Sequence, residues 1–350
     1  MLGPAVTRSG PALSVLDLAP VGEGASVTDA LESSIELAVA AERLGYRRHW
    51  VAEHHNMPGI ASSAPAVLIA HLAAATSVIR LGSGGVMLPN HAPLVIAEQF
   101  GTLEALHRGR IDLGLGRAPG TDPLTAYALR RSRNGQSEDD FAEQLAELVG
   151  FFDGDFPDDH PFGRITSVPG LGHRPAIWLL GSSDYSARLA ARLGLPFSFA
   201  HHFAAGGTDI AARIYRERFE PSVHLAEPYL MLGVAALAAD TTEQARWLSG
   251  STKLAVLRLR QGRPGRYPTP EEAAAFHFTP NEREVVKQFT ASHVVGDPEA
   301  VRTGLDELVE RTGADELMIT TMVHGPKDRI RSYELIADAF DLDPVRPDGR

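Results

Sequence analysis

Short apolar runs alternate with amphipathic segments along almost the whole chain. Each apolar run has the length of a strand, and several are continuous, as in parallel strands that are covered on both faces. The predicted strands are 13–17, 48–52, 80–88, 111–116, 176–181, 196–200, 229–238 and 316–321.

Helical patterns lie between the predicted strands. The first helix is predicted to begin near Ser26 or Thr28, to carry an apolar stripe with Leu31 and Ile35, and to end at Gly45. The other predicted helices are 64–77, 93–107, 137–152, 183–193, 208–219, 241–260, 298–311 and 328–340. This alternation predicts an α/β fold, a (β/α)8 TIM barrel. The alternative is an open doubly wound sheet, which the lack of a Gly-x-Gly-x-x-Gly motif at the first helix disfavours.

Two segments interrupt the alternation. The connection 153–174 is rich in Pro, Gly and His, and 261–295 is a long insertion before the last helix–strand unit. Long irregular segments in compact domains often act as lids, so we expect a lid at 261–295, with a passive surface loop as the alternative. The chain is expected to form one barrel domain over 1–350, with a loose N-terminal tail over 1–11.

Composition narrows the possible partners. The net charge of −11 argues against nucleic acid or an anionic membrane. No apolar run approaches the roughly 18 residues that span a bilayer, and the N-terminus lacks the apolar core of a secretory signal. The lack of cysteine excludes disulfides, thiolate nucleophiles and cysteine metal ligands. We expect a cytoplasmic protein.

An acid and two histidines, Glu53-His54-His55, end the second predicted strand. Titratable side chains at the carboxyl end of a barrel strand are typical of an active site. A histidine there can transfer protons near neutral pH. A structural histidine pair is the alternative. Metal binding is not expected, because adjacent histidines cannot both easily reach one ion and no His-x-His is present.

Two connections are candidates for binding a phosphate. Arg117 follows the fourth strand in a glycine-rich turn, where it could clamp a phosphate or be an ordinary surface arginine. The fifth strand enters its helix through Gly181-Ser182-Ser183-Asp184-Tyr185-Ser186. Hydroxyl groups at a helix N-terminus suit an anion, although Ser182 or Ser183 could equally be a simple N-cap.

Other side chains follow predicted strands and could line the barrel mouth or be half-buried in loops. These substrate-pocket candidates are Leu18, His55, Met87, His201, His202 and His324. A hydrolase triad and a P-loop are unsupported, because the chain has neither Gly-x-Ser-x-Gly nor a Walker-type Gly-Lys-Ser/Thr loop.

Taken together and in this order, several stretches resemble the bacterial luciferase-like flavin-dependent monooxygenases. The distinctive ones are 53–55, 82–89, 109–117, and 181–183 through 194–196. Each is weak alone, but their combination is specific. The similarity extends from about residue 13 to residue 340.

The resemblance implies a barrel that binds FMN, or its reduced form, at the carboxyl ends of the strands. His54 matches the family's catalytic histidine, and Arg117, Ser183 and Ser186 match its phosphate-binding positions. Gly84-Gly85 matches a cis peptide under the flavin ring. The full set of implied cofactor-binding residues is Gly84, Gly85, Arg117, Gly181, Ser182, Ser183, Tyr185 and Ser186.

The implied activity is that of the oxygenase of a two-component system. A separate NAD(P)H:flavin reductase would supply FMNH2. One oxygen atom from O2 would pass through a flavin hydroperoxide into a small organic substrate, with tailoring of secondary metabolites as one setting. The alternatives are an F420-dependent dehydrogenase and a non-catalytic FMN-binding protein. Gly116 replaces the reactive cysteine of luciferase, so light emission is not expected. A homodimer through helices near the second and third units is expected.

Overall fold

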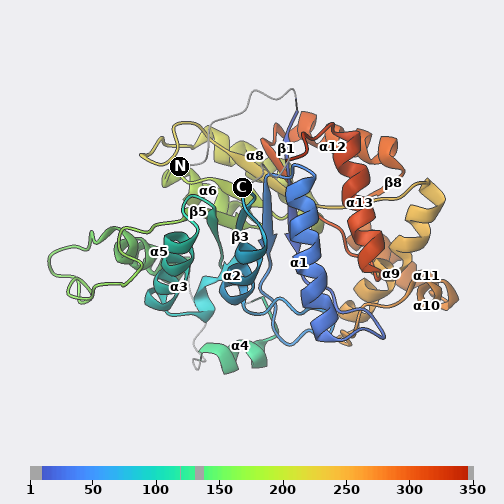
Figure 1. Cartoon of the computed structure of the whole chain (residues 1–350), viewed down its shortest axis with the longest axis horizontal. Coiled ribbons are helices and arrows are strands. Elements are labelled where there is room, and N and C mark those ends of the chain that lie inside the picture. Colours follow the sequence, from blue (N-terminus) through green and yellow to red (C-terminus); the bar gives the residue numbers. More distant parts are fainter. Residues whose placement is uncertain (1–9, 119, 131–137, 346–350) are drawn as a thin grey trace.

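The computed structural model describes residues 10–118, 120–130 and 138–345. Eight parallel strands form a closed barrel (Figure 1), which confirms the predicted TIM barrel. Their order around the barrel is β1-β2-β3-β4-β5-β6-β7-β9, and β9 pairs with β1 to close it. The strands are β1 Ala12–Asp17, β2 Arg48–Val51, β3 Arg80–Met87, β4 Ile111–Gly116, β5 Ala176–Gly181, β6 Phe197–Phe199, β7 Leu230–Ala238 and β9 Glu316–Thr320.

Helices cover the outside of the barrel. Ser26 caps α1 in a capping box with Asp29, and Gly45 follows the helix end with a positive φ of 86°, as the sequence signals predicted. The α-helices are α1 Val27–Arg43, α2 Pro65–Ala75, α3 Pro93–Leu106, α4 Pro123–Arg130, α5 Glu138–Asp153, α6 Asp184–Arg192, α7 His201–Ala204, α8 Thr208–Glu217, α9 Thr242–Arg260, α10 Pro270–Ala275, α11 Pro280–Thr290, α12 Pro298–Thr312 and α13 Pro326–Ala339. Two short 3-10 helices, η1 Leu88–Asn90 and η2 Ala205–Gly207, complete the set in the described residues. Within that set no helix is both long and apolar enough to cross a bilayer.

The insertion 261–295 is not irregular, which corrects the sequence prediction. It contains α10, α11 and the start of a short strand, β8 Val294–Gly296, which pairs with the end of β7. Thr269 and Thr279 cap α10 and α11, each followed by a proline in the first helical position. Proline is common in irregular segments, but Thr-Pro here begins a helix at both positions. Both helices pack against α9, at the lower right of Figure 1.

A similar signal marks α4, which the sequence analysis did not predict. The Asp122 side chain accepts hydrogen bonds from the backbone N–H groups of Leu124 and Thr125, and Pro123 occupies the first helical position. The remaining unpredicted helix, α7, has only 4 residues, which is too short for a periodic pattern. The predicted tail over 1–11 falls almost entirely outside the described residues.

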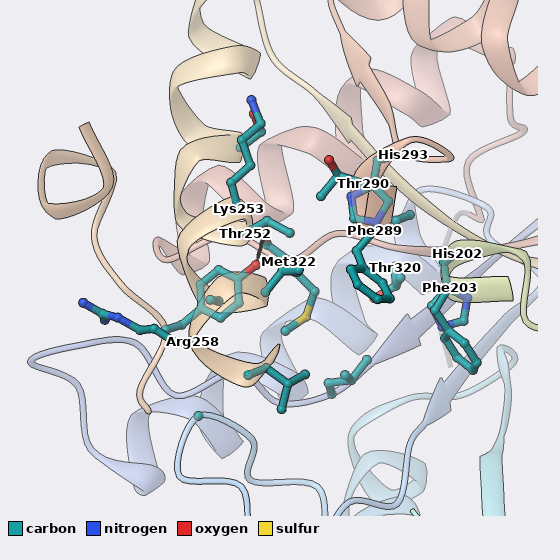
Figure 2. Close-up of a pocket in the computed structure, with 18 of the residues that line it drawn as sticks. His202, Phe203, Thr252, Lys253, Arg258, Phe289, Thr290, His293, Thr320 and Met322 are labelled. Atoms are coloured by element: carbon teal, nitrogen blue, oxygen red, sulfur yellow. Dashed lines mark hydrogen bonds between the residues drawn. The ribbon is translucent and has the colours of Figure 1, made fainter. Parts of the chain in front are cut away.

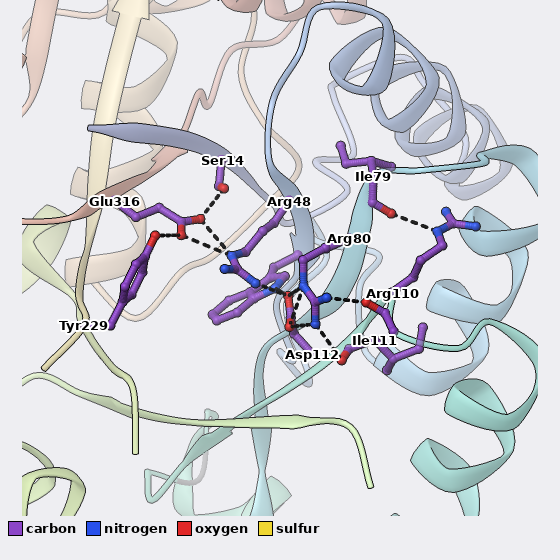
Figure 3. A network of polar contacts seen from close by, with 11 residues as sticks. Ser14, Arg48, Ile79, Arg80, Arg110, Ile111, Asp112, Tyr229 and Glu316 are labelled. Atoms are coloured by element: carbon purple, nitrogen blue, oxygen red, sulfur yellow. Dashed lines mark hydrogen bonds and ion pairs between the residues drawn. The ribbon is translucent and has the colours of Figure 1, made fainter. Parts of the chain in front are cut away.

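The amino-terminal end of the barrel interior is filled by a buried ionic network (Figure 3). Arg48 is fully buried and binds Glu316 at 2.9 Å and Asp112 at 2.8 Å. Arg80 also binds Asp112, at 2.6 Å, and the Tyr229 hydroxyl donates to Glu316. Burial alone would raise the pKa of Asp112, but the Arg48 and Arg80 guanidinium groups hold that pKa below its usual value.

An apolar layer lies above this network, toward the carboxyl ends of the strands. It contains Leu16, Trp50, Trp178, Met231 and Met318. Glycines on β3 make room for the indole of Trp50: a Cβ on Gly82 would lie 2.7 Å from Trp50 Nε1. The two layers fill the lower barrel with side chains, so a functional site is expected at the carboxyl ends of the strands.

Candidate active site

Glu53 organises the loops at the carboxyl ends of β2 and β3. Its carboxylate is fully buried, accepts a hydrogen bond from the Met87 backbone N–H, and lies 3.0 Å from His55 Nε2 and 2.9 Å from His91 Nε2. Burial would raise the pKa of Glu53, but the hydrogen bond and charge of His91, together with His55, lower it. Glu53 belongs to the motif Glu53-His54-His55, whereas His91 lies outside every motif that pointed to a site. The signal in the sequence that could have identified Glu53 as a site residue is an acidic side chain directly after an apolar strand.

His54 points away from this cluster. Its backbone N–H donates to the Ser62 carbonyl, and its ring Nδ1 lies 3.4 Å from the Gly120 carbonyl oxygen. Burial lowers the pKa of His54, so the imidazole is neutral at pH 7. A carbonyl oxygen only accepts, which assigns the proton to Nδ1 and leaves the lone pair on Nε2.

The peptide bond Gly84-Gly85 is cis, as the resemblance implied. These glycines leave β3 without side chains beside β4. A Cβ on Gly85 would lie 2.8 Å from the Gly114 carbonyl oxygen, so a larger residue cannot be placed there without moving β4.

The two phosphate candidates come together because β4 and β5 are neighbours in the sheet. The Arg117 guanidinium lies over the ring of Tyr185, 4.4 Å from its centroid. Ser183 occupies the N-cap position of α6, but its side chain makes no capping hydrogen bond. The simple N-cap alternative is therefore not observed for Ser183. Ser186 packs against Gly181, where a Cβ would lie 2.6 Å from that of Ser186. Ser182 is exposed at the same turn.

A cavity of about 530 Å³ opens beside His54 (Figure 2). One wall is α9, another is the segment 264–267 with 289–295, and the floor comes from the ends of β7 and β9. Backbone hydrogen bonds join Tyr267 to Val21 and Glu23, which fixes this wall to the loop after β1. The insertion therefore covers part of the barrel mouth, whereas its opening and closing as a lid stays a prediction.

The cavity brings together Leu18, His54 and His202 among the predicted site residues. The other pocket candidates lie elsewhere. His201 is buried against Thr208, 2.7 Å away, and His324 lies 2.9 Å from the Glu23 carbonyl. His55 is held by Glu53, as described, and Met87 packs near Gly116 and Gly120. Sequence reasoning missed the cavity-facing side of α9 and His293, because it treated α9 as an ordinary covering helix.

Comparison with known proteins agrees with this geometry. A family profile described as luciferase-like monooxygenase matches residues 12–316. The chain is 49% identical over 327 residues to a luciferase-like monooxygenase of Escherichia coli K12, covering 93% of this chain and 96% of that protein. It is 38% identical over 331 residues to the N-acetyl-S-alkylcysteine monooxygenase of Bacillus subtilis 168, covering 93% and 97%. The crystal structure of apo-MsnO8 has a TM-score of 0.87 at 40% identity, covering 96% of this chain and 100% of that one.

Fold, site and relatives together define a flavin-dependent monooxygenase. The chain belongs to the luciferase-like monooxygenase family. Two more remote structures share the fold alone. The oxygenating constituent of 3,6-diketocamphane monooxygenase in complex with FMN has a TM-score of 0.70 at 20% identity, covering 95% of this chain and 98% of that one. An F420-dependent secondary alcohol dehydrogenase with an F420-acetone adduct has a TM-score of 0.68 at 14% identity, covering 94% of this chain and 99% of that one.

Proposed function

We propose that this protein is the oxygenase of a two-component system that uses FMNH2 and inserts one oxygen atom from O2 into a small organic substrate. The observation behind this proposal is the pairing of Arg117 with the N-terminus of α6. A guanidinium, backbone N–H groups at a helix N-terminus and serine hydroxyls would suit a phosphate ester. FMN has such a phosphate and riboflavin does not.

The described residues fit FMN along one arc of the barrel mouth. Arg117, Ser182, Ser183 and Ser186 with Gly181 and Tyr185 would hold the phosphate, and the side-chain-free backbone of Gly84-Gly85 would face the ring. Bound reduced FMN would supply the electrons that activate O2. The cavity beside His54 remains available for an organic substrate.

The chain's own residues bind, orient and move protons in this proposal. His54 Nε2 would accept or return a proton at the reacting end of the cavity. Glu53 is a positioning residue, because it holds the β2 and β3 loops in one arrangement through Met87 and His91. The wall formed by 261–295 would exclude water as a lid.

The reduced flavin would come from a separate NAD(P)H:flavin reductase. No dinucleotide-binding glycine motif opens the first helix, so the chain shows no recognisable site for NAD(P)H of its own. The monooxygenase named for N-acetyl-S-alkylcysteine shows that a relative of similar length acts on a small sulfur-containing acid.

Replacing Arg117 with Ala should weaken FMN binding about tenfold to a hundredfold, since a charge-assisted hydrogen bond contributes about 1.5–3 kcal/mol. Riboflavin binding should not change. Quenching of flavin fluorescence measures both constants. Arg331→Ala, on the exposed face of α13, is the matched control. If wild-type protein binds riboflavin and FMN equally well, the phosphate site is wrong.

The reaction of the wild-type protein with reduced flavin and O2 also distinguishes an oxygenase from the two alternative functions. Protein-bound FMNH2 should be oxidised by O2 with a time course unlike that of free FMNH2, followed by stopped-flow absorbance. Reoxidation indistinguishable from that of free flavin, together with tight binding of F420, would support the dehydrogenase. Tight binding of oxidised FMN without accelerated chemistry would support a flavin carrier.

A homodimer through α2 and α3 is the second part of the proposal. The helix α2 has no charged residue, although Val67 and Ala70 on it are exposed, and Leu106 at the end of α3 is 71% exposed. Exposed apolar side chains grouped on a surface helix are typical of an interface. Val67→Glu should therefore convert a dimer to a monomer in light scattering after size exclusion. A wild-type monomer, or an unchanged dimer in the variant, would contradict this interface.

A further inference from the structure

The cavity beside His54 has a one-sided charge. Among the described residues that line it, 5 are Lys or Arg and none is Asp or Glu. The whole chain, in contrast, has 44 acidic residues against 33 basic ones. A cationic cavity in an acidic protein favours an anionic ligand. The cations are Arg246, Lys253, Arg258, Arg260 and Arg266.

Three of these cations have partners within the protein. Arg258 binds Glu272 at 2.5 Å, Arg260 lies 3.6 Å from the centroid of the Phe289 ring, and Arg266 donates to the Ala25 carbonyl. In the described part of the chain, Lys253 and Arg246 have no ion pair. They are two turns apart on α9, so they share the face that lines the cavity.

The positive charge of Lys253 affects His293, which lines the same cavity. Burial lowers the pKa of His293, and the charge of Lys253 lowers it further, so that imidazole is neutral at pH 7. The ring N–H of His293 donates to the His202 backbone carbonyl, so the positive charge for an anion in this part of the cavity comes from Lys253. Figure 2 shows Lys253, Thr290 and His293 in the upper half of the view, with Lys253 to the left of the other two and Arg258 directed to the lower left.

Apolar side chains join the cationic end to His54. Val256, Phe289 and Met322 line the middle of the cavity, and Leu18 and Ile60 line it near the barrel mouth. Such a cavity suits a molecule with an apolar body and one charged end. An anion beside Lys253 would also offset the cost of holding a partly buried ammonium without a counter-charge.

We propose that the organic substrate is an anion, a carboxylate or sulfonate with an apolar body, whose charged group binds Lys253 on the face of α9 that Lys253 shares with Arg246. This inference rests on the proposed function, because His54 marks the reacting end only if the protein is a monooxygenase with its flavin at Gly84-Gly85. The flavin phosphate is assigned elsewhere, at β4 and β5. The cationic cavity lies at β7 and β9, on another arc of the mouth.

The test compares 4-phenylbutyrate with its neutral analogue 4-phenylbutanamide. Their binding to the full chain, with and without saturating FMN, is measured by ligand-observed NMR titration at low salt. The carboxylate should bind at least about tenfold more tightly than the amide, as expected for one charge-assisted contact. Lys253→Met should abolish that preference and leave the amide unaffected. Lys327→Met, at an exposed position outside the cavity, should change neither.

Several outcomes would overturn the anion site. These are equal binding of the two probes, no binding of either at millimolar concentration, or a preference that survives in Lys253→Met. Loss of phenylbutyrate binding in Arg117→Ala would also overturn it, because the anion would then occupy the phosphate site. Failure of the flavin proposal is distinguishable, since it appears as weak or phosphate-independent FMN binding while the preference for phenylbutyrate remains.

Discussion

Replacing Arg48 with Met should destabilise the protein by about 3–5 kcal/mol, the cost of removing one partner from a buried ion pair. Arg48 is fully buried and joins Asp112 to Glu316 across the barrel. Methionine fills similar space but leaves Glu316 without its cation and Asp112 with Arg80 as its one remaining cation, beside the hydrogen bond from Trp50 Nε1. Urea unfolding followed by fluorescence gives the free energy of unfolding of both proteins.

The pH dependence of this loss of stability in Arg48→Met provides a second check on the role of the buried network. The folded pKa of Asp112 is below its unfolded value, so its contribution to stability is present at neutral pH and is lost as pH falls through the folded pKa. In Arg48→Met the Asp112 carboxylate should protonate at higher pH, because Arg48 no longer lowers its pKa, and a neutral carboxyl needs no cation. The difference in free energy of unfolding between the wild type and Arg48→Met should therefore become smaller as the pH approaches about 4.

Arg331→Met is the matched control, because Arg331 and Asp240 form an exposed pair at 2.6 Å. Exposed pairs contribute about 0–1 kcal/mol, so this variant should unfold almost like the wild type. Equal effects of the two substitutions would mean that the barrel network contributes no more than a surface ion pair.

Replacing His54 with Ala should lower turnover about a hundredfold to ten-thousandfold, the usual contribution of a positioned acid–base group. FMN binding should be largely retained, because Arg117 and the N-terminus of α6 lie after β4 and β5 rather than after β2. Oxygen uptake coupled to product formation measures turnover, and fluorescence quenching measures FMN affinity. Equal loss of both would identify His54 as a scaffold residue.

The wild-type pH profile should agree with the burial of His54. Burial lowers the pKa of His54 from its ordinary value of 6.5, so the neutral imidazole persists to lower pH than in a free histidine. The acid limb of kcat/KM should consequently have its midpoint below 6.5 and should be absent in His54→Ala. His224→Ala, an exposed histidine outside the cavity, should leave the profile unchanged.

The sequence alone could predict the barrel because its signals are local. Each strand is a continuous apolar run, and Ser26 with Asp29 and Gly45 mark both ends of α1 within a few residues. The order of these units is sufficient for the fold, since eight strand–helix units in succession close a barrel. The places of Arg117 after β4 and of Ser183 after β5 were also predictable, because strand ends are local features, whereas their role in binding a phosphate stays a prediction.

Local signals are ambiguous where the same dipeptide occurs in two kinds of structure. Thr269-Pro270 and Thr279-Pro280 begin helices, although proline also marks loops, and only packing against α9 decided between the two. His201 and His202 are adjacent in sequence, yet one is bonded to Thr208 and the other lines the cavity. A short helix turns successive side chains to different faces, which no composition or spacing rule resolves.

The sequence by itself determined which residues stand at the carboxyl ends of the strands, because strand ends are local features of the chain. Only the tertiary structure decided which of them meet. Glu53 reaches His91 across 38 positions, and Arg48 reaches Glu316 across 268. Lys253 and His293 face one cavity with His54 because α9 and the insertion cover the barrel mouth. Such contacts depend on the closure of the barrel, a property of the whole sheet rather than of any segment.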